Sequence, residues 1–185
     1  MARLMERYRK EIVPQLQKEL GYANPMAVPR LEKISLNMGV GKATENKNRI
    51  PAAVKDLAAI TGQQPVTTRS RQAVAGFKLR ENQEIGCKVT LRGRRMYEFL
   101  DRLISIVLPR VRDFRGLSPK SYDRAGNYSL GLADQLVFSE IAADRVEFPQ
   151  GMDVTLTVRA RKPEDSKALL KALGMPFRTP DAGKA

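Results

Sequence analysis

Residues 153–161 read Asp-Val-Thr-Leu-Thr-Val-Arg-Ala-Arg, with apolar and polar side chains in alternation. Residues 33–38, Lys-Ile-Ser-Leu-Asn-Met, and residues 88–92, Lys-Val-Thr-Leu-Arg, carry the same pattern. A period of two is typical of a strand buried on one face only, because successive side chains of a strand point to opposite faces. The three stretches therefore predict a sheet with one apolar face and one polar face.

The two faces of this predicted sheet differ in chemistry. The polar side chains are cations, hydroxyls and an amide, which bond phosphate and 2′-hydroxyl oxygens. Solvated strand faces are often Lys and Thr, but three such strands in one basic chain favour RNA. The apolar set is Ile34, Leu36, Met38, Val89, Leu91, Val154, Leu156 and Val158, and the polar set is Lys33, Ser35, Asn37, Lys88, Thr90, Arg92, Thr155, Thr157, Arg159 and Arg161.

The charge of the chain is large and unevenly spread. The 185 residues carry a net charge of +13, which indicates a polyanionic partner, either nucleic acid or an anionic membrane surface. The stretch from Arg69 to Arg95 holds eight Lys or Arg against two Glu, whereas Asp134 to Asp153 holds five acids against Arg145 alone. We therefore expect the basic and the acidic segments to meet different partners.

Residue types needed for catalysis are sparse. The chain has no histidine, and its one cysteine, Cys87, shares parity with Val89, so a buried thiol in a reducing cytoplasm is expected. The segment 39–42, Gly-Val-Gly-Lys, fails as a phosphate loop because Leu36 and Ala43 stand where Gly and Ser or Thr are needed. We expect no enzyme, no metal site and no cofactor.

A membrane role is disfavoured on two grounds. No stretch approaches the roughly 18 apolar residues of a membrane span. The one candidate for a basic amphipathic surface helix, residues 2–20, contains Glu6, Glu11 and Glu19.

Helical periodicity accompanies the strands. Residues 2–20 predict a helix that Pro14 kinks or splits, and residues 94–108 predict a helix ended by Pro109. A helix ending at Thr61 should turn Ile50, Val54, Leu57 and Ala58 inward, and another should begin at Pro163.

The remaining segments complete the expected architecture. Residues 128–132 predict a short edge strand, and residues 135–148 are compatible with helix or loop. This order of elements predicts one α+β domain over residues 1–178, a mostly antiparallel sheet with helices packed on one face and an open basic and polar face. Residues 179–185 are expected to form a flexible tail.

The kind of RNA can be narrowed from the aromatic residues. A face that stacks single-stranded bases needs aromatics, and the polar set has none, so a structured RNA gripped by its backbone and 2′-hydroxyls is favoured. Phe77 lies in a polar loop that contains Gly76. Such an aromatic is more often a local anchor, but Lys78 and Arg80 flank it and could carry the loop to a second RNA.

Several segments carry a family resemblance. They are Leu-Ala-Ala-Ile-Thr-Gly-Gln-Gln-Pro-Val-Thr-Thr-Arg-Ser-Arg-Gln-Ala at 57–73, Pro-Arg-Leu-Glu-Lys-Ile-Ser-Leu-Asn-Met-Gly-Val-Gly at 29–41, and shorter segments at 76–80, 86–93, 128–131 and 148–150. Together they resemble the ribosomal protein L5 family of the large subunit, which binds 5S ribosomal RNA (5S rRNA). The similarity covers about residues 2–178 in one register, and the length suggests the bacterial form.

The resemblance implies a cytoplasmic, structural role in the central protuberance, with 5S rRNA and neighbouring large-subunit proteins as partners. It places the loop around Phe77 near the elbow of P-site tRNA, and residues 110–150 against the small-subunit head and its basic protein S13. The acidic segment fits that last role on electrostatic grounds. Solubility, with pairing to Arg145, explains the acids nearly as well.

The predicted site residues form three groups. Those expected to bind rRNA are Lys33, Asn37, Gln63, Thr68, Arg69, Lys88, Thr90 and Arg92; those of the tRNA-contact loop are Phe77, Lys78 and Arg80; those of the subunit bridge are Asp134, Glu140, Asp144 and Glu147.

Overall fold

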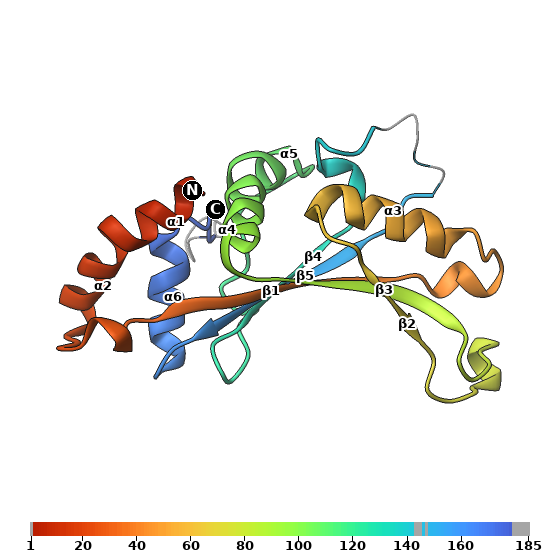
Figure 1. Ribbon diagram of the computed structural model, residues 1–185, viewed down its shortest axis with the longest axis horizontal. Helices are drawn as coiled ribbons and strands as arrows, with labels where there is room; N and C mark the ends of the chain where they lie inside the picture. The colour runs from red at the N-terminus through yellow and green to blue at the C-terminus, as the bar shows by residue number, and fades with distance from the viewer. Residues whose placement is uncertain (1, 143–145, 147, 179–185) are drawn as a thin grey trace, which may run out of the picture. The chain divides into compact units, whose positions relative to one another are not determined.

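A computed structural model of the chain describes residues 2–142, 146 and 148–178. It confirms the predicted α+β class: helices accompany one five-stranded antiparallel sheet with strand order β2-β3-β1-β5-β4 (Figure 1). The strands are β1 Arg30–Gly39, β2 Val66–Arg69, β3 Glu84–Leu91, β4 Tyr128–Leu132 and β5 Met152–Arg159.

The longer helices are α2 Val13–Leu20, α3 Arg49–Thr61, α4 Gly93–Arg102 and α6 Pro163–Ala172, and the shorter ones are α1 Arg3–Arg7 and α5 Leu108–Arg110. The π-helical turns are η1 Tyr8–Ile12 and η5 Leu103–Val107. The 3₁₀ turns are η2 Pro25–Ala27, η3 Gly41–Thr44, η4 Ala75–Phe77 and η6 Gln135–Val137.

The chain divides into two compact units. Unit 1 comprises Met1–Ile34, Leu91–Leu130 and Thr155–Ala185, and unit 2 comprises Ser35–Thr90 and Gly131–Val154. The predicted domain limits of 1–178 stay a prediction, and the expected tail at 179–185 lies outside the described residues.

In unit 2 the strands bury alternate side chains, as the two-residue period predicts. Leu36 and Met38 of β1 and Cys87 and Val89 of β3 are buried, whereas their polar neighbours are wholly or partly exposed. Helix α3 lies alongside this part of the sheet (Figure 1). Its fully buried residues are Ile50, Ala53, Leu57, Ile60 and Thr61, so the predicted inward positions Val54 and Ala58 are only half-buried and flank the centre of the stripe.

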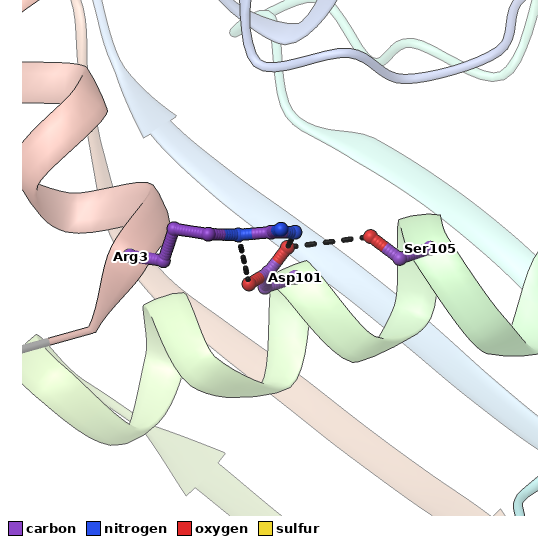
Figure 2. Close-up of polar contacts among 3 residues, drawn as sticks. All are labelled: Arg3, Asp101 and Ser105. Atoms are coloured by element: carbon purple, nitrogen blue, oxygen red, sulfur yellow. Dashed lines mark hydrogen bonds and ion pairs between the residues drawn. The ribbon is translucent and has the colours of Figure 1, made fainter.

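In unit 1 the N-terminal helix is fastened to α4 by a polar contact. Arg3 donates from Nη2 and Nε to the two carboxylate oxygens of Asp101, at 2.7 and 3.2 Å. The Ser105 hydroxyl donates to the same carboxylate at 3.3 Å (Figure 2). The pKa of Arg3 is raised, first by its hydrogen bond to Asp101 and then by the charge of that carboxylate. Such an exposed pair orients the helix more than it stabilises it.

Two prolines lie just after π-helical turns. The Val13 N–H donates to the Tyr8 carbonyl, five residues back, and Pro14 follows; the Leu108 N–H donates to the Leu103 carbonyl, and Pro109 follows. Proline lacks an N–H, and its ring collides with the carbonyl four residues earlier in a regular α-helix. The wider turn removes that collision. Pro14 therefore divides the first helix, as predicted, but the prediction that Pro109 ends its helix was wrong by one short turn, because α5 continues to Arg110.

The segment after α5 is largely irregular, as expected. It includes β4, which is confirmed as an edge strand of the sheet. The ambiguity over residues 135–148 resolves into the single turn η6, with no α-helix among the described residues of that stretch.

Candidate RNA interface

The polar side chains of the unit 2 strands face solvent. Asn37, Lys88 and Thr90 are exposed, and each stands beside a buried neighbour in its strand. Strand β2 pairs with β3 so that Val66 opposes Lys88 and Thr68 opposes Gly86. Opposed residues of an antiparallel pair share one face, so the half-buried Thr68 lies on the face of Lys88. The strands of this unit thus present cation, hydroxyl and amide groups without an aromatic.

Gln63 lies between α3 and β2, and its side chain is held by β3. Its Nε2 donates to the Thr90 carbonyl at 3.4 Å, and its backbone N–H donates to the Thr61 hydroxyl at 3.3 Å. Gly62 adopts the left-handed conformation, with φ of 63°, which ends the helix there. The Oε1 of Gln63 stays available as an acceptor beside Thr90, in line with a role in bonding a base edge or a ribose hydroxyl.

Arg69, like Arg92, already has an acidic partner within the chain. A register shift between Thr68 and Arg69 turns the arginine toward Glu84, and the Nη2–Oε1 distance is 3.2 Å. Both side chains are well exposed, so the pair contributes little to stability. An RNA phosphate would have to share this guanidinium with Glu84.

Lys33 and Arg92 belong to unit 1. Arg92 lies 3.7 Å from the carboxylate of Glu32, and Lys33 is half-buried. The other six predicted rRNA contacts fall within unit 2.

The segment 70–83 is an ordered hairpin end rather than a formless loop. Val74 and Leu79 exchange backbone hydrogen bonds of 3.0 and 3.1 Å around the turn η4. Lys78 adopts the left-handed conformation, with φ of 54°. Phe77 at the tip is 74% exposed, which argues against a local anchor and leaves the ring free to meet a partner.

The two residues of the predicted subunit bridge that the structure describes are half-buried. Asp134 is half-buried and caps η6, accepting from the Leu136 N–H at 3.4 Å. Glu140 is also half-buried and accepts from the Ser139 hydroxyl at 3.2 Å. Asp144 and Glu147 lie outside the described residues.

Cys87 is buried, as its parity predicts. Burial, and secondarily the charge of Asp56, raise the pKa of its thiol to about 11. Burial also raises the pKa of Asp56, although a hydrogen bond from Gln135 opposes the shift. A thiol held protonated in this way is a poor nucleophile.

In the part of the chain that the structure describes, no group of three or more Cys, Asp or Glu residues is placed to hold a metal ion. None of the helices described is long and apolar enough to cross a membrane.

Two features of this surface were not predicted from the sequence. Val66 is 62% exposed and lies opposite Lys88. Its side chain is an apolar group on an otherwise polar strand face. Asn82 is left-handed, with φ of 60°, and shapes the hairpin end. Asparagine is enriched in that conformation, so its place in a polar loop was a usable signal.

These features define a class: a basic α+β protein that offers polar strand faces and a cationic hairpin. The model of the family described as Ribosomal protein L5 matches residues 24–80, and the model of that family's C-terminus matches residues 84–177. The chain belongs to the ribosomal protein L5 family, whose members are ribosomal proteins and not enzymes.

Curated relatives extend over the same range. "Large ribosomal subunit protein uL5" of Anaeromyxobacter sp. (strain Fw109-5) is 59% identical over 177 residues, 96% of this chain and 98% of the relative. The protein of the same name from Psychrobacter cryohalolentis is 56% identical over 178 residues, 96% of this chain and 100% of the relative. That of Rubrobacter xylanophilus is 54% identical over 178 residues.

Proposed function

We propose that this large-subunit ribosomal protein of the cytoplasmic ribosome binds 5S rRNA in the central protuberance, beside neighbouring large-subunit proteins. The observation that carries the proposal is the burial pattern of the unit 2 strands. Asn37, Lys88 and Thr90 face solvent while Leu36, Val89 and Met38 are buried. A strand face of this composition suits phosphate and ribose rather than an apolar partner.

Binding to purified 5S rRNA tests this proposal. Lys88→Ala with Thr90→Ala should weaken binding while leaving the fold intact, because both side chains are exposed. Arg124→Ala, another exposed cation, serves as the control. Wild-type affinity in the Lys88/Thr90 variant would refute a role for this face. Tight binding to unrelated structured RNA of equal length would favour the alternative of a general RNA-binding protein acting outside the ribosome.

We further propose that the hairpin end meets P-site tRNA through Phe77. Its ring is 74% exposed at the tip of an ordered turn. Exposed aromatics stack on bases or riboses. Phe77→Ala should lower the affinity of ribosomes for P-site tRNA without changing 5S rRNA binding, and loss of both together would contradict a tip-specific role.

The third proposal is a contact of the acidic segment with protein S13 of the small-subunit head. Five acids lie between Asp134 and Asp153. Exposed pairs across an interface are each worth about 0–1 kcal/mol, yet together they set association rate and salt dependence. Reversing Asp144 and Glu147 to lysine should weaken subunit joining and leave 5S rRNA binding unchanged or slightly tighter. Normal joining at low salt by the folded variant would leave only a solubility role.

A further inference from the structure

A cationic basin lies in unit 2 between the segment after β1 and the hairpin end of β2 and β3. Its volume is about 660 Å³, and the residues that matter here are Lys47, Arg69, Lys78, Arg80, Asn82 and Glu84. The turn η3, whose Ala43 and Thr44 line the basin, and the hairpin end of β2 and β3 lie toward the same end of this unit (Figure 1). The volume falls within the roughly 300–1,000 Å³ of ligand-binding pockets, so it exceeds what a bare phosphate ion fills.

The charge of the basin is strongly positive. Four of its lining residues are cations and one, Glu84, is an acid that pairs with Arg69 at 3.2 Å. Within the described part of the chain, Lys47, Lys78 and Arg80 have no ion pair. Glu45 and Glu81 are exposed neighbours in sequence but do not line the basin. Three uncompensated cations around one hollow indicate an anion as its occupant.

The wall formed by the hairpin is held by its own hydrogen bonds. The Ser70 N–H donates to the Gln83 carbonyl at 2.8 Å, and the Asn82 N–H donates to the Ser70 carbonyl at 3.0 Å. The Arg80 N–H donates to the Oε1 of Gln83 at 3.1 Å. Left-handed backbone at Lys78 and Asn82 fixes where the chain turns on either side of Arg80. A lysine rarely adopts this conformation, and such strain collects at functional positions.

Neutral polar groups complete the lining. The basin includes the hydroxyl of Thr44 and the amides of Asn82 and Gln83, and none of the described residues that line it is aromatic. Gln83 uses its Oε1 internally, so its Nε2 can donate to a ligand. Cations beside hydroxyl and amide groups suit a phosphate with its ribose, whereas a nucleobase is typically bound by stacking on an aromatic side chain.

We propose that this basin holds one ribose-phosphate unit of ribosomal RNA, an inference that rests on the proposed RNA-binding function. Lys78 and Arg80 then serve the rRNA together with Arg69 and Lys47, and only Phe77 at the tip is left for the tRNA. The location supports rRNA as the source, because Arg69 lies at the end of β2 and Lys47 lies in the segment before α3, so neither is at the exposed tip of the hairpin.

The free protein offers the first test. Uridylyl-3′,5′-uridine is titrated at constant ionic strength, with its 2′-deoxy analogue and inorganic phosphate as comparisons, and backbone amide NMR shifts are followed. We expect saturable shifts at Lys47, Lys78 and Asn82, largest for the ribose form and absent from the variant Lys78→Asn with Arg80→Gln. Asparagine tolerates the left-handed conformation, which protects the fold. Shifts that persist in the variant would overturn the basin.

The second test uses 5S rRNA and the salt dependence of its binding. The same double variant should lower the log–log salt slope by roughly 0.7–0.9, the contribution of the one phosphate that the basin holds. The matched control, Arg71→Gln with Arg124→Gln, removes the same charge from exposed positions that do not line the basin. An equal fall in slope for both variants would overturn the inference.

Comparison of the variants distinguishes a failure of the basin from a failure of the proposed 5S rRNA binding, and rRNA from tRNA as the ligand of the basin. If the Lys88 and Thr90 variant loses 5S rRNA while the basin variant keeps wild-type affinity and slope, the basin inference fails and the proposed function stands. Ribosomes carrying the basin variant should hold P-site tRNA normally, whereas those carrying Phe77→Ala should not. Weakened tRNA binding with an unchanged rRNA slope would overturn the rRNA assignment.

Discussion

Leu36 and Asn37 are neighbours on β1 with opposite environments, and they give a sharp test of the two-faced strand. Leu36 is fully buried and Asn37 is exposed. Leu36→Ala removes three carbons, worth about 2.4 kcal/mol at roughly 0.8 kcal/mol each. A residual cavity of roughly 60 Å³ would add about 1.5 kcal/mol at 24 cal/mol per Å³. The free energy of unfolding should therefore fall by about 4 kcal/mol.

Asn37→Ala should behave in the opposite way. An exposed side chain of this kind changes the free energy of unfolding by no more than about 0.5 kcal/mol. Its loss should cost about 1–3 kcal/mol of RNA affinity if it bonds a base edge. Urea denaturation followed by circular dichroism measures the first quantity, and 5S rRNA titration the second. A stable Leu36→Ala protein beside an unfolded Asn37→Ala protein would refute the face assignment; Leu91→Ala and Thr90→Ala repeat the comparison on β3.

Three further predictions concern the thiol, a glycine and salt. Cys87 should resist alkylation at pH 8, and rapid labelling of the native protein would contradict this. The free energy of unfolding should fall as pH rises from 9 toward 11, because the thiol of the unfolded chain has a pKa near 9 whereas that of the native protein has a pKa of about 11. Gly126→Ala should lower the free energy of unfolding, measured by urea denaturation, by about 1–3 kcal/mol. At Gly126 φ is +84°, and the new Cβ would lie 2.5 Å from the Ser166 Oγ. Gly76→Ala is the control: its Cβ meets nothing within 4 Å, so the free energy of unfolding should hardly change. Wild-type 5S rRNA binding should show a log–log salt slope built from roughly four to six phosphate contacts at about 0.7–0.9 each, and a flat response would rule out the polar strand face.

The strands could be predicted because their signal is local. Each apolar residue at Ile34, Leu36, Met38, Val154, Leu156 and Val158 is buried, and the two-residue period alone required it. Gly21 and Gly62 likewise end their helices in the left-handed conformation, with φ of 68° and 63°. Both features depend only on neighbouring residues.

Features that depend on residues distant in the sequence or on the hydrogen-bonding pattern could not be predicted from the sequence alone. The pairing of Arg69 with Glu84 needs the β2–β3 register and its shift, which periodicity does not specify. The presence of Lys47 and Arg80 in the lining of one basin needs the hairpin to lie beside the segment after β1. Pro109 was expected to end its helix, and only the hydrogen-bonding pattern reveals the wider turn that accommodates it.

The π-helical turns before Pro14 and Pro109 have a bearing on how these helices tolerate change. Proline inside a regular helix costs about 3 kcal/mol relative to alanine. Before Pro14 the helix already makes a hydrogen bond that spans five residues, from the Val13 N–H to the Tyr8 carbonyl, so most of this energetic cost is avoided. Replacing Pro14 alone therefore gains little stability. Pro14→Ala alone would leave the surplus residue of the wide turn in place. Only replacement together with deletion of one residue from 8–12 restores α-helical spacing, because the deletion removes the surplus residue that the wide turn accommodates. The two positions are thus coupled: neither change is useful without the other.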